Sequence, residues 1–346
     1  MKITYMIGNG FDINAGLKTR FSDFFKVYCQ NRDDDSEVIK AFKKEIGNNV
    51  SEWADFERKM GEYTKHVRPW GSLSREDYFT CIEDFRIHLV AYLEKEEENY
   101  CWPTTISNKA VSVAHMLEYP FEHLRKGHQE VLNQYISQRD DASEVEYNFI
   151  VFNYTTLIDR LLERVKFSGG VHLTQDNRQA SITGKLSIIH LHGQLTDEIL
   201  LGIDNVSQIA NEEMRTDEEF RYSYVKPISN RELQAQRDIL AKDCIESSDI
   251  IIIYGMSIGA TDESWWRICA DWILEGRKGG VEHYLIVYDY NESMSKSSPG
   301  NVVKSQRAIR KKFMEKQGSK EDEGEQEYMG NHILCALNVD LLKGRG

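Results

Sequence analysis

Six short hydrophobic runs are spread along the chain, and they predict β-strands that are buried on both faces. They are rich in Ile, Val and Tyr, and most show no alternation of hydrophobic and polar positions. Their sequences are KITYMI (2–7), YNFIVF (147–152), LSIIHL (186–191), DIIIIY (249–254), HYLIVY (283–288) and HILCAL (332–337). Such strands are typical of parallel sheets covered by helices on both sides.

Segments with helical periodicity lie between several of these runs. One apolar face is formed by Leu157, Ile158, Leu161, Leu162 and Val165, and another by Trp265, Cys269, Trp272 and Ile273. Strands that alternate with helices predict an α/β fold with a doubly wound, mostly parallel, Rossmann-like sheet.

Two segments interrupt this rhythm and predict the domain organisation. Residues 31–145 are charged, rich in aromatic residues and helix-patterned, which indicates a large helical insertion subdomain. Residues 204–243 form a smaller polar insertion. The α/β core is therefore expected to comprise residues 1–30 and 146–346.

Composition narrows the range of partners and the cellular location. The chain has 346 residues, and 43 Lys and Arg against 56 Asp and Glu give a net charge of −13, which disfavours nucleic acid and anionic membranes. No hydrophobic run approaches the roughly 18 residues of a membrane span, and no signal peptide is evident, so we expect a cytoplasmic protein.

The cysteines point to reduced thiols. Cys29, Cys81, Cys101, Cys244, Cys269 and Cys335 are scattered without any C-x-x-C pair. This spacing favours neither a disulfide framework nor a zinc site.

A glycine turn follows the first hydrophobic run, at Gly8-Asn9-Gly10. Such a turn lets the backbone approach a ligand, and its N–H groups, with those of a following helix, can hold a pyrophosphate. The dinucleotide fingerprint is incomplete, because position 13 is Ile instead of a third glycine. Nucleotide binding and a plain tight turn therefore both remain open.

Polar residues also follow two later strands. Asn153 comes after the second run, where it either faces a ligand crevice or caps a turn. His192 precedes Gly193 at the end of the third run, a position suited to a general base. His190 lies within that run and is expected to be a core histidine with a partner. No third ligand lies near this pair, so a metal is not expected.

The segment after the fourth run offers a different chemistry. Gly255-Met256-Ser257-Ile258-Gly259 matches the G-x-S-x-G pattern of a serine hydrolase, and the chain order permits a triad of Ser257, Asp289 and His332. In the alternative, the glycines let the turn pass close to a ligand, Ser257 donates a hydrogen bond and Asp262 lies in the first turn of a helix.

Five separated motifs, taken in order, resemble the AbiH family of bacterial abortive-infection proteins. They are IGNGFDINAGLKTRFSDFF (7–25), WADFE (53–57), FNYTTLID (152–159), IHLHG (189–193) and IYGMSIGATDESWW (253–266). The resemblance implies an effector of an anti-phage response. The helical insertion is covered only by the second motif.

More distantly, the same layout is similar to the SIR2-like superfamily of sirtuins and NAD-consuming enzymes. That similarity implies a SIR2-like sheet with NAD as substrate or ligand. The residues that match its nucleotide-binding elements are Gly8, Gly10, Asp12, Gly16, Leu17, Asp23, Phe24, Gly255, Ser257 and Asp262, and the same turn adds Asn9 and Phe11. Asn153 matches the asparagine that contacts the nicotinamide ribose or the attacking water, and His192 matches the base.

The departures from this pattern limit what the similarity implies. Asn9 and Asp12 stand where a serine-containing turn is usual, and Thr155 replaces an acid for which Asp159 is the nearest alternative. The zinc-binding cysteines of protein-deacetylating sirtuins are absent, so deacetylation is not implied.

The resemblance leads to one leading hypothesis and two alternatives. The leading hypothesis is hydrolysis of NAD at the nicotinamide–ribose bond, with Asn153 positioning water, His192 as base and Asp12 steadying the ribose. The alternatives are a module that binds NAD or ADP-ribose without cleaving it, and the serine hydrolase. The helical insertion is a candidate surface for homo-oligomer formation, and the phage trigger is not indicated by any motif.

Overall fold

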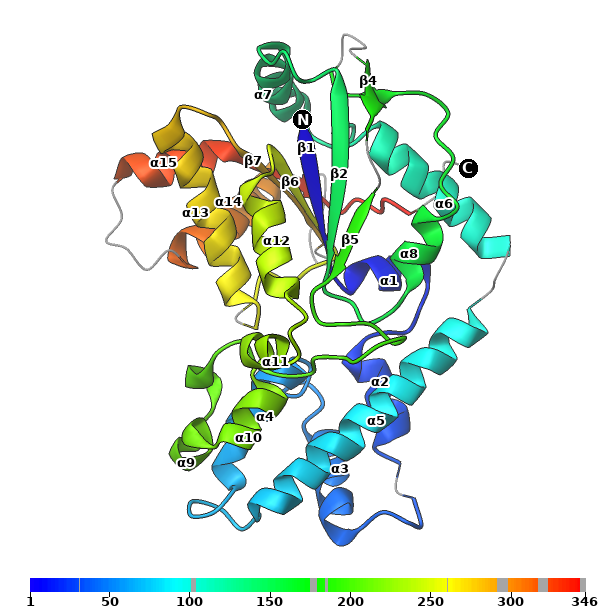
Figure 1. Cartoon of the computed structure of the whole chain (residues 1–346), viewed down its shortest axis with the longest axis vertical. Helices are drawn as coiled ribbons and strands as arrows, with labels where there is room; N and C mark the ends of the chain where they lie inside the picture. The colour runs from blue at the N-terminus through cyan, green and yellow to red at the C-terminus, as the bar shows by residue number, and fades with distance from the viewer. Residues whose placement is uncertain are drawn as a thin grey trace.

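A mostly parallel β-sheet occupies the upper part of the molecule in Figure 1. The computed structural model describes residues 1–30, 32–100, 104–174, 179–183, 186–259, 261–290, 298–316 and 323–342. The strands run in the order β3-β4-β2-β1-β6-β7-β8, and β5 also pairs with β2. Their bounds are β1 Lys2–Ile7, β2 Glu144–Val151, β3 Val171–His172, β4 Gln179–Ile182, β5 Ser187–His190, β6 Ile250–Tyr254, β7 Tyr284–Asp289 and β8 Ile333–Leu337.

The pairing confirms the strands expected from the six hydrophobic runs. All the strand pairs named above are parallel except β3 with β4. Strand β1 is central, because Ile3 pairs with Tyr147 of β2 on one side and with Ile250 of β6 on the other. The strands that follow β1 first fill one side of the sheet, and those from β6 onward fill the other.

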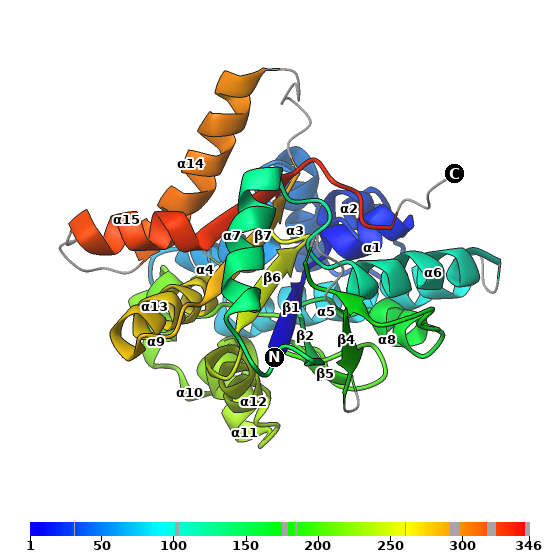
Figure 2. The same ribbon diagram turned by 90° about the horizontal axis from the view of Figure 1, so that it is seen from above.

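Helices cover both faces of the sheet, as Figure 2 shows from above. Alternate strand residues face opposite layers, so Tyr5 and Ile252 join one hydrophobic cluster while Met6 and Ile253 join the other. The first cluster includes residues of α1 (Gly10–Ala15), α6 (Thr104–Glu118), α7 (Lys126–Ser137) and α8 (Leu157–Leu162). The second includes residues of α12 (Arg237–Glu246), α13 (Glu263–Gly279), α14 (Pro299–Lys316) and α15 (Glu323–His332).

A third hydrophobic cluster builds the helical part in the lower half of Figure 1. It is rich in aromatic rings, and Phe56 and Phe85 stack with ring centroids 3.6 Å apart. Its helices are α2 (Phe21–Tyr28), α3 (Glu37–Asn48), α4 (Phe56–Tyr63), η1 (Thr64–His66) and α5 (Arg75–Asn99). From the later polar segment come η2 (Val206–Gln208), α9 (Glu212–Thr216), α10 (Glu218–Tyr224) and α11 (Lys226–Glu232).

Hydrophobic packing crosses the domain boundaries that the sequence predicts. Phe24 of α2 belongs to the helical cluster, whereas Ile106 and Leu132, of α6 and α7, pack against the sheet. The later segment also contributes Phe220 to the helical cluster, so the two insertions share one core. That residues 31–145 form a separate subdomain stays a prediction from the sequence.

Two expectations from composition concern helices and thiols. Within the described ranges, no helix combines the length and apolarity needed to cross a membrane. The five cysteines in those ranges are free thiols, and burial raises the pKa of Cys269 and Cys335 to about 12. Cys101 lies outside the described residues.

Candidate functional site

The loops that follow β1 and β6 lie in direct contact, and glycines make this possible. Gly8 N donates to Tyr254 O at 2.9 Å, and Gly10 N donates to Gly255 O at 2.7 Å. A Cβ on Gly10 would lie 2.6 Å from the Gly255 Cα, and Gly255 itself has a φ of +72°. The contact between the two loops therefore already explains the glycine turn at the start of the chain, before any ligand is considered.

A cavity of about 300 Å³ opens beside these loops, at the carboxyl ends of the parallel strands. Segments that follow β1, β2, β5 and β6 contribute Gly8, Asn9, Asn153, Thr155, His192 and Ser257. The α1 helix contributes Asp12, and the helical part contributes Thr19, Phe21, Asp55, Glu57, Leu89 and Leu93. The cavity thus lies between the sheet and the helical part.

Hydrogen bonds from two side chains join the helical part to the loops of the sheet at the cavity. The hydroxyl of Thr261, in the loop after β6, donates to the carboxylate of Asp55 at 3.0 Å. Asp55 immediately precedes α4. Tyr154, after β2, donates from its hydroxyl to Glu57 Oε1 at 3.1 Å. Both contacts join a loop of the sheet to the start of α4, at its N-cap residue Asp55 and at Glu57 in its first turn.

Asp12 is a fully buried carboxyl group on α1. Burial raises its pKa to about 7, although hydrogen bonds from Thr155 and Asn153 act in the opposite direction. The Thr155 hydroxyl lies 2.6 Å from Oδ2 of Asp12. Near neutral pH, Asp12 is therefore present in both charged and uncharged forms.

Asn153 lies between β2 and α8 and is 6% exposed. Its side-chain oxygen is buried and accepts no hydrogen bond from the described residues. Buried polar atoms normally have a partner, so this oxygen is an unsatisfied acceptor in a residue that lines the cavity.

His192 lies two residues beyond the end of β5 and is 5% exposed. Burial and the nearby Lys226 ammonium lower the pKa of its ring well below the usual value, and a hydrogen bond to the Phe152 backbone opposes this. Nε2 of His192 lies 3.7 Å from Oδ1 of Asp262. The imidazole is therefore neutral near pH 7 and can accept a proton.

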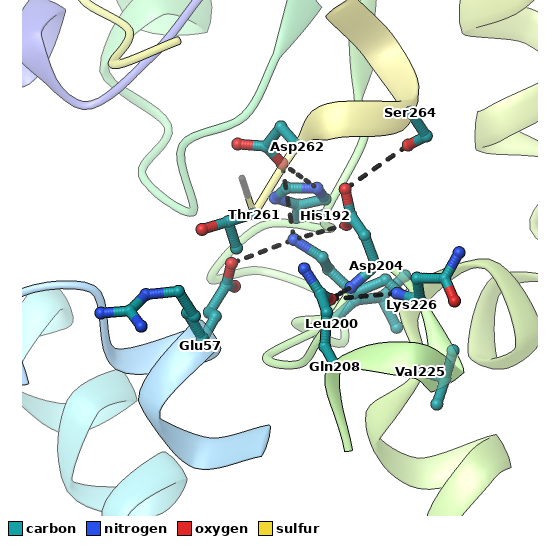
Figure 3. A network of polar contacts seen from close by, with 12 residues as sticks. Glu57, His192, Leu200, Asp204, Gln208, Val225, Lys226, Thr261, Asp262 and Ser264 are labelled. Carbon is teal, nitrogen blue, oxygen red and sulfur yellow. Dashed lines mark hydrogen bonds and ion pairs between the residues drawn. The ribbon is translucent and has the colours of Figure 1, made fainter. Parts of the chain in front are cut away.

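Beside the cavity, three carboxylates surround the Lys226 ammonium (Figure 3), and two of them, Glu57 and Asp262, belong to residues that line it. Nζ lies 3.0 Å from Glu57, 3.1 Å from Asp204 and 3.5 Å from Asp262. Glu57 belongs to α4, Asp204 precedes η2, Lys226 begins α11 and Asp262 precedes α13. This cluster, called here the Lys226 cluster, joins both insertions to the core.

Burial and mutual charge set the protonation of the Lys226 cluster. Burial raises the pKa of Glu57 to about 7 and that of Asp204 to about 6, while the lysine acts in the opposite direction. Burial alone would lower the pKa of Lys226, but the three carboxylates raise it well above its ordinary value. The lysine is therefore the permanent cation of this cluster.

His192, Asp204 and Asp262 also have the geometry of a metal-binding set, with ligand atoms within 4.8 Å of one another. The Lys226 ammonium contacts both of these carboxylates, so it already supplies positive charge at this place. This arrangement does not test whether a metal binds here, so the expectation from the sequence that none does stays a prediction.

The other predicted nucleotide-binding residues fall into two groups. Asn9, Ser257 and Asp262 line the cavity together with the catalytic candidates. Phe11 is instead buried in the core, where its ring lies edge-on to Tyr254, and Asp23 forms an ion pair with Lys26 at 2.7 Å on α2. Neither lines the cavity.

The three remaining residues of the first matched element have structural positions. Gly16 ends α1 with a φ of +111°, and Leu17 and Phe24 are buried in different hydrophobic clusters. Their roles in the fold are enough to explain why the sequence has Gly16, Leu17 and Phe24 at these positions.

His190 has the partner that the sequence predicted for a core histidine. Its Nε2 lies 2.9 Å from Oδ2 of Asp159, on α8. Because β5 ends at His190, the strand alternation does not extend to His192, and the two rings have different surroundings.

The structure does not assemble the serine hydrolase triad. Ser257 lines the cavity at the carboxyl end of β6, but His332 precedes β8 and stacks on Tyr284, which begins β7. In a parallel sheet, the carboxyl end of β6 and the amino ends of β7 and β8 lie at opposite ends of the strands. Asp289 ends β7 and therefore lies away from His332. The chain order that permits a triad does not produce one.

Fold and site together define an α/β protein with a polar crevice at the carboxyl ends of parallel strands. The family model described as "Bacteriophage abortive infection AbiH" matches residues 4–277. The chain belongs to this family, and the match includes the cavity residues named above. No protein with curated function and no solved structure matches the chain.

Proposed function

We propose that this protein hydrolyses NAD at the nicotinamide–ribose bond, within the phage abortive-infection role that its family implies. The observation that carries the proposal is the meeting of Asn153, His192 and Asp12 on one cavity beside the glycine loops. These residues come from three segments far apart in the sequence.

The strand order supports a dinucleotide as the ligand. Numbered in chain order, the strands β1, β2, β5, β6, β7 and β8 lie in the order 3-2-1-4-5-6. This is the order of Rossmann-like folds, which bind dinucleotides outside the carboxyl ends of the strands where the order reverses. Here that reversal falls between β1 and β6, whose loops carry Gly8 and Gly255 at the cavity.

The side chains suit the proposed reaction. A water oxygen bonds to C1′ of the ribose, the C1′–N bond breaks, and its electron pair stays on the nicotinamide nitrogen. Asn153 positions this water, and the neutral His192 imidazole accepts its proton. The ionised form of Asp12 stabilises the positive charge that develops on the ribose.

Release of nicotinamide from NAD by the purified protein tests the proposal. We expect His192→Ala and Asn153→Ala each to slow release on the order of 10²-fold or more. His172→Ala is the matched control, because His172 lies on β3 and does not line this cavity. Intact NAD after incubation with the wild-type protein, or full activity in His192→Ala, would contradict hydrolysis.

Calorimetry separates hydrolysis from binding alone. Saturable binding of NAD or ADP-ribose to the wild-type protein, with no nicotinamide released, would support the non-catalytic module instead. Loss of that binding in Asn153→Ala would still place the ligand in this cavity.

A further inference from the structure

The cavity beside the glycine loops has an acidic lining. Among the residues that the structure describes, this lining includes the carboxylic acids Asp12, Asp55, Glu57 and Asp262, and neither a lysine nor an arginine. An anionic group such as a pyrophosphate would be repelled by ionised acids there, whereas a cation would be attracted. The lining therefore suits a ligand group that carries positive charge.

Three of these acids already have a cationic partner. Glu57 Oε2 and Asp262 Oδ1 lie 3.0 Å and 3.5 Å from Nζ of Lys226, and Asp55 Oδ2 lies 3.6 Å from Nε of Arg58. A ligand cation would compete with these side chains for the same carboxylates.

Asp12 is the acid of this lining that hydrogen-bonding neutral side chains hold instead of a cation. Its neighbours are Thr155, which donates to Oδ2 at 2.6 Å, and Asn153. Oδ1 of Asp12 and the side-chain oxygen of Asn153 are both buried without a hydrogen-bond partner within the described ranges. The two residues are 1% and 6% exposed, and both line the cavity. Because both unsatisfied atoms are acceptors, a donor or a cation is the group that would satisfy them.

Aromatic rings complete the lining and indicate which kind of cation fits. Phe21, Phe152 and Tyr154 all line the cavity, and Leu89 and Leu93 add apolar surface from α5. Aromatic faces attract cations and pack well against planar rings. An aromatic cation matches both the acids and this apolar surface.

We infer that this cavity is selective for a cationic aromatic ring, and that it takes the positively charged nicotinamide ring of oxidised NAD with Asp12 as the counter-ion. The inference rests on the proposed function for the identity of the ring. The nicotinamide riboside half of NAD is the part that the cavity encloses, and the pyrophosphate lies outside the acidic lining. The positive charge is on the ring before cleavage and passes to the ribose as the C1′–N bond breaks, so one carboxylate serves both states.

Binding of small ligands to the full-length protein tests this selectivity without any reaction. The probe is 1-methylnicotinamide, which carries the charged ring but no ribose to cleave. Nicotinamide and 6-methylnicotinamide are the neutral controls, and the second matches the probe in size. At pH 8 most of Asp12 is ionised, because its pKa is about 7. In ligand-detected NMR titrations at this pH, we expect 1-methylnicotinamide to bind about 10-fold or more tightly than either neutral ring.

Variants of Asp12 locate the charge that causes this preference. Asp12→Asn keeps the shape of the side chain but removes its charge, and we expect the preference for the cation to disappear. Asp12→Ser also removes the charge and serves if the amide does not fold, as judged by circular dichroism. Asp271→Asn is the matched control, because Asp271 is exposed on α13 and does not line the cavity. This control should keep the full preference.

The outcomes separate this inference from the proposed function. Equal affinities for charged and neutral rings, or no detectable binding of 1-methylnicotinamide, would overturn the inference. A preference that persists in a folded Asp12 variant would also overturn it. If the preference depends on Asp12 but NAD is not cleaved, the proposed function fails while the selectivity of the cavity stands. If NAD is cleaved but the cation is not preferred, the inference fails alone.

Discussion

The Thr155 hydroxyl donates a 2.6 Å hydrogen bond to Asp12, joining the segment after β2 to the first helix inside the protein. Thr155→Val keeps the shape of the side chain but leaves the buried carboxyl group without this donor. We expect the free energy of unfolding to fall by about 1–3 kcal/mol. The loss should be greater at pH 8 than at pH 5, because the charged carboxylate depends most on the donor.

Urea unfolding at the two pH values measures this loss. Thr80→Val is the control, because Thr80 is exposed on α5 and bonds only to its own helix backbone among the contacts described, at 2.8 Å. Its change should stay within about 0.5 kcal/mol. Equal effects of the two substitutions would contradict the importance of the Asp12 contact.

Asp12 makes stability depend on pH in a predictable direction. Its pKa is raised from 3.8 to about 7 in the folded protein, so between these values the folded state holds a proton that the unfolded state releases. The contribution of Asp12 to stability is therefore full below the unfolded pKa and is lost as the pH rises toward 7. Asp12→Asn does not titrate, and it should gain stability relative to the wild type as the pH rises.

The relative gain of Asp12→Asn between pH 4 and pH 8 should reach a few kcal/mol, at most about 4. Urea unfolding of both proteins across this range measures it. A constant difference, or one that favours the wild type at high pH, would show that Asp12 is not protonated in the folded state.

Gly255 supports the contact between the two glycine loops. An added Cβ would lie 2.5 Å from the Phe11 nitrogen, and the φ of +72° is unfavourable for alanine. We expect Gly255→Ala to lower the free energy of unfolding by about 2–4 kcal/mol, measured by chemical denaturation.

Gly127 provides the matched comparison for that substitution. It is exposed on α7, and an added Cβ would meet nothing within 4 Å. Gly127→Ala should stabilise the protein by about 0.5–1 kcal/mol through helix propensity. A similar sign for both substitutions would mean that the loop contact is not tight.

A fluorophosphonate probe tests the absence of a serine triad. His332 stacks on Tyr284 at the amino ends of β7 and β8, whereas Ser257 follows the carboxyl end of β6. The His332 imidazole therefore cannot activate the Ser257 hydroxyl. We expect no labelling of the wild-type protein, detected by mass spectrometry. Labelling that disappears in Ser257→Ala would restore the hydrolase hypothesis.

The sequence was most informative about the sheet. Strands such as β1 and β6 are buried on both faces, so burial itself leaves an unbroken hydrophobic run in the sequence. The strands β3 and β4 escaped prediction because Val171–His172 is only 2 residues long and Gln179–Ile182 includes polar positions. Short edge strands depend on their neighbours more than on their own pattern.

Only those residues of the candidate site that directly follow a strand could be predicted from the sequence. Asn153 and His192 follow strands, so the fold class alone places them at the crevice. Asp204 and Lys226 come from a polar segment whose position depends on packing against α4, and a single lysine there has no distinguishing pattern. Glu57 ends the WADFE motif and Asp262 lies in the IYGMSIGATDESWW motif, and these two motifs were the signals that pointed to this cluster.

The central position of β1 has a consequence for biosynthesis. Residues 2–7 are made long before their second neighbour: β1 gains it only when residues 250–254 have been made, and Asp262 completes the cavity later still. A nascent chain therefore carries no finished crevice for most of its translation. Premature termination before residue 250 would therefore yield fragments that lack the complete cavity.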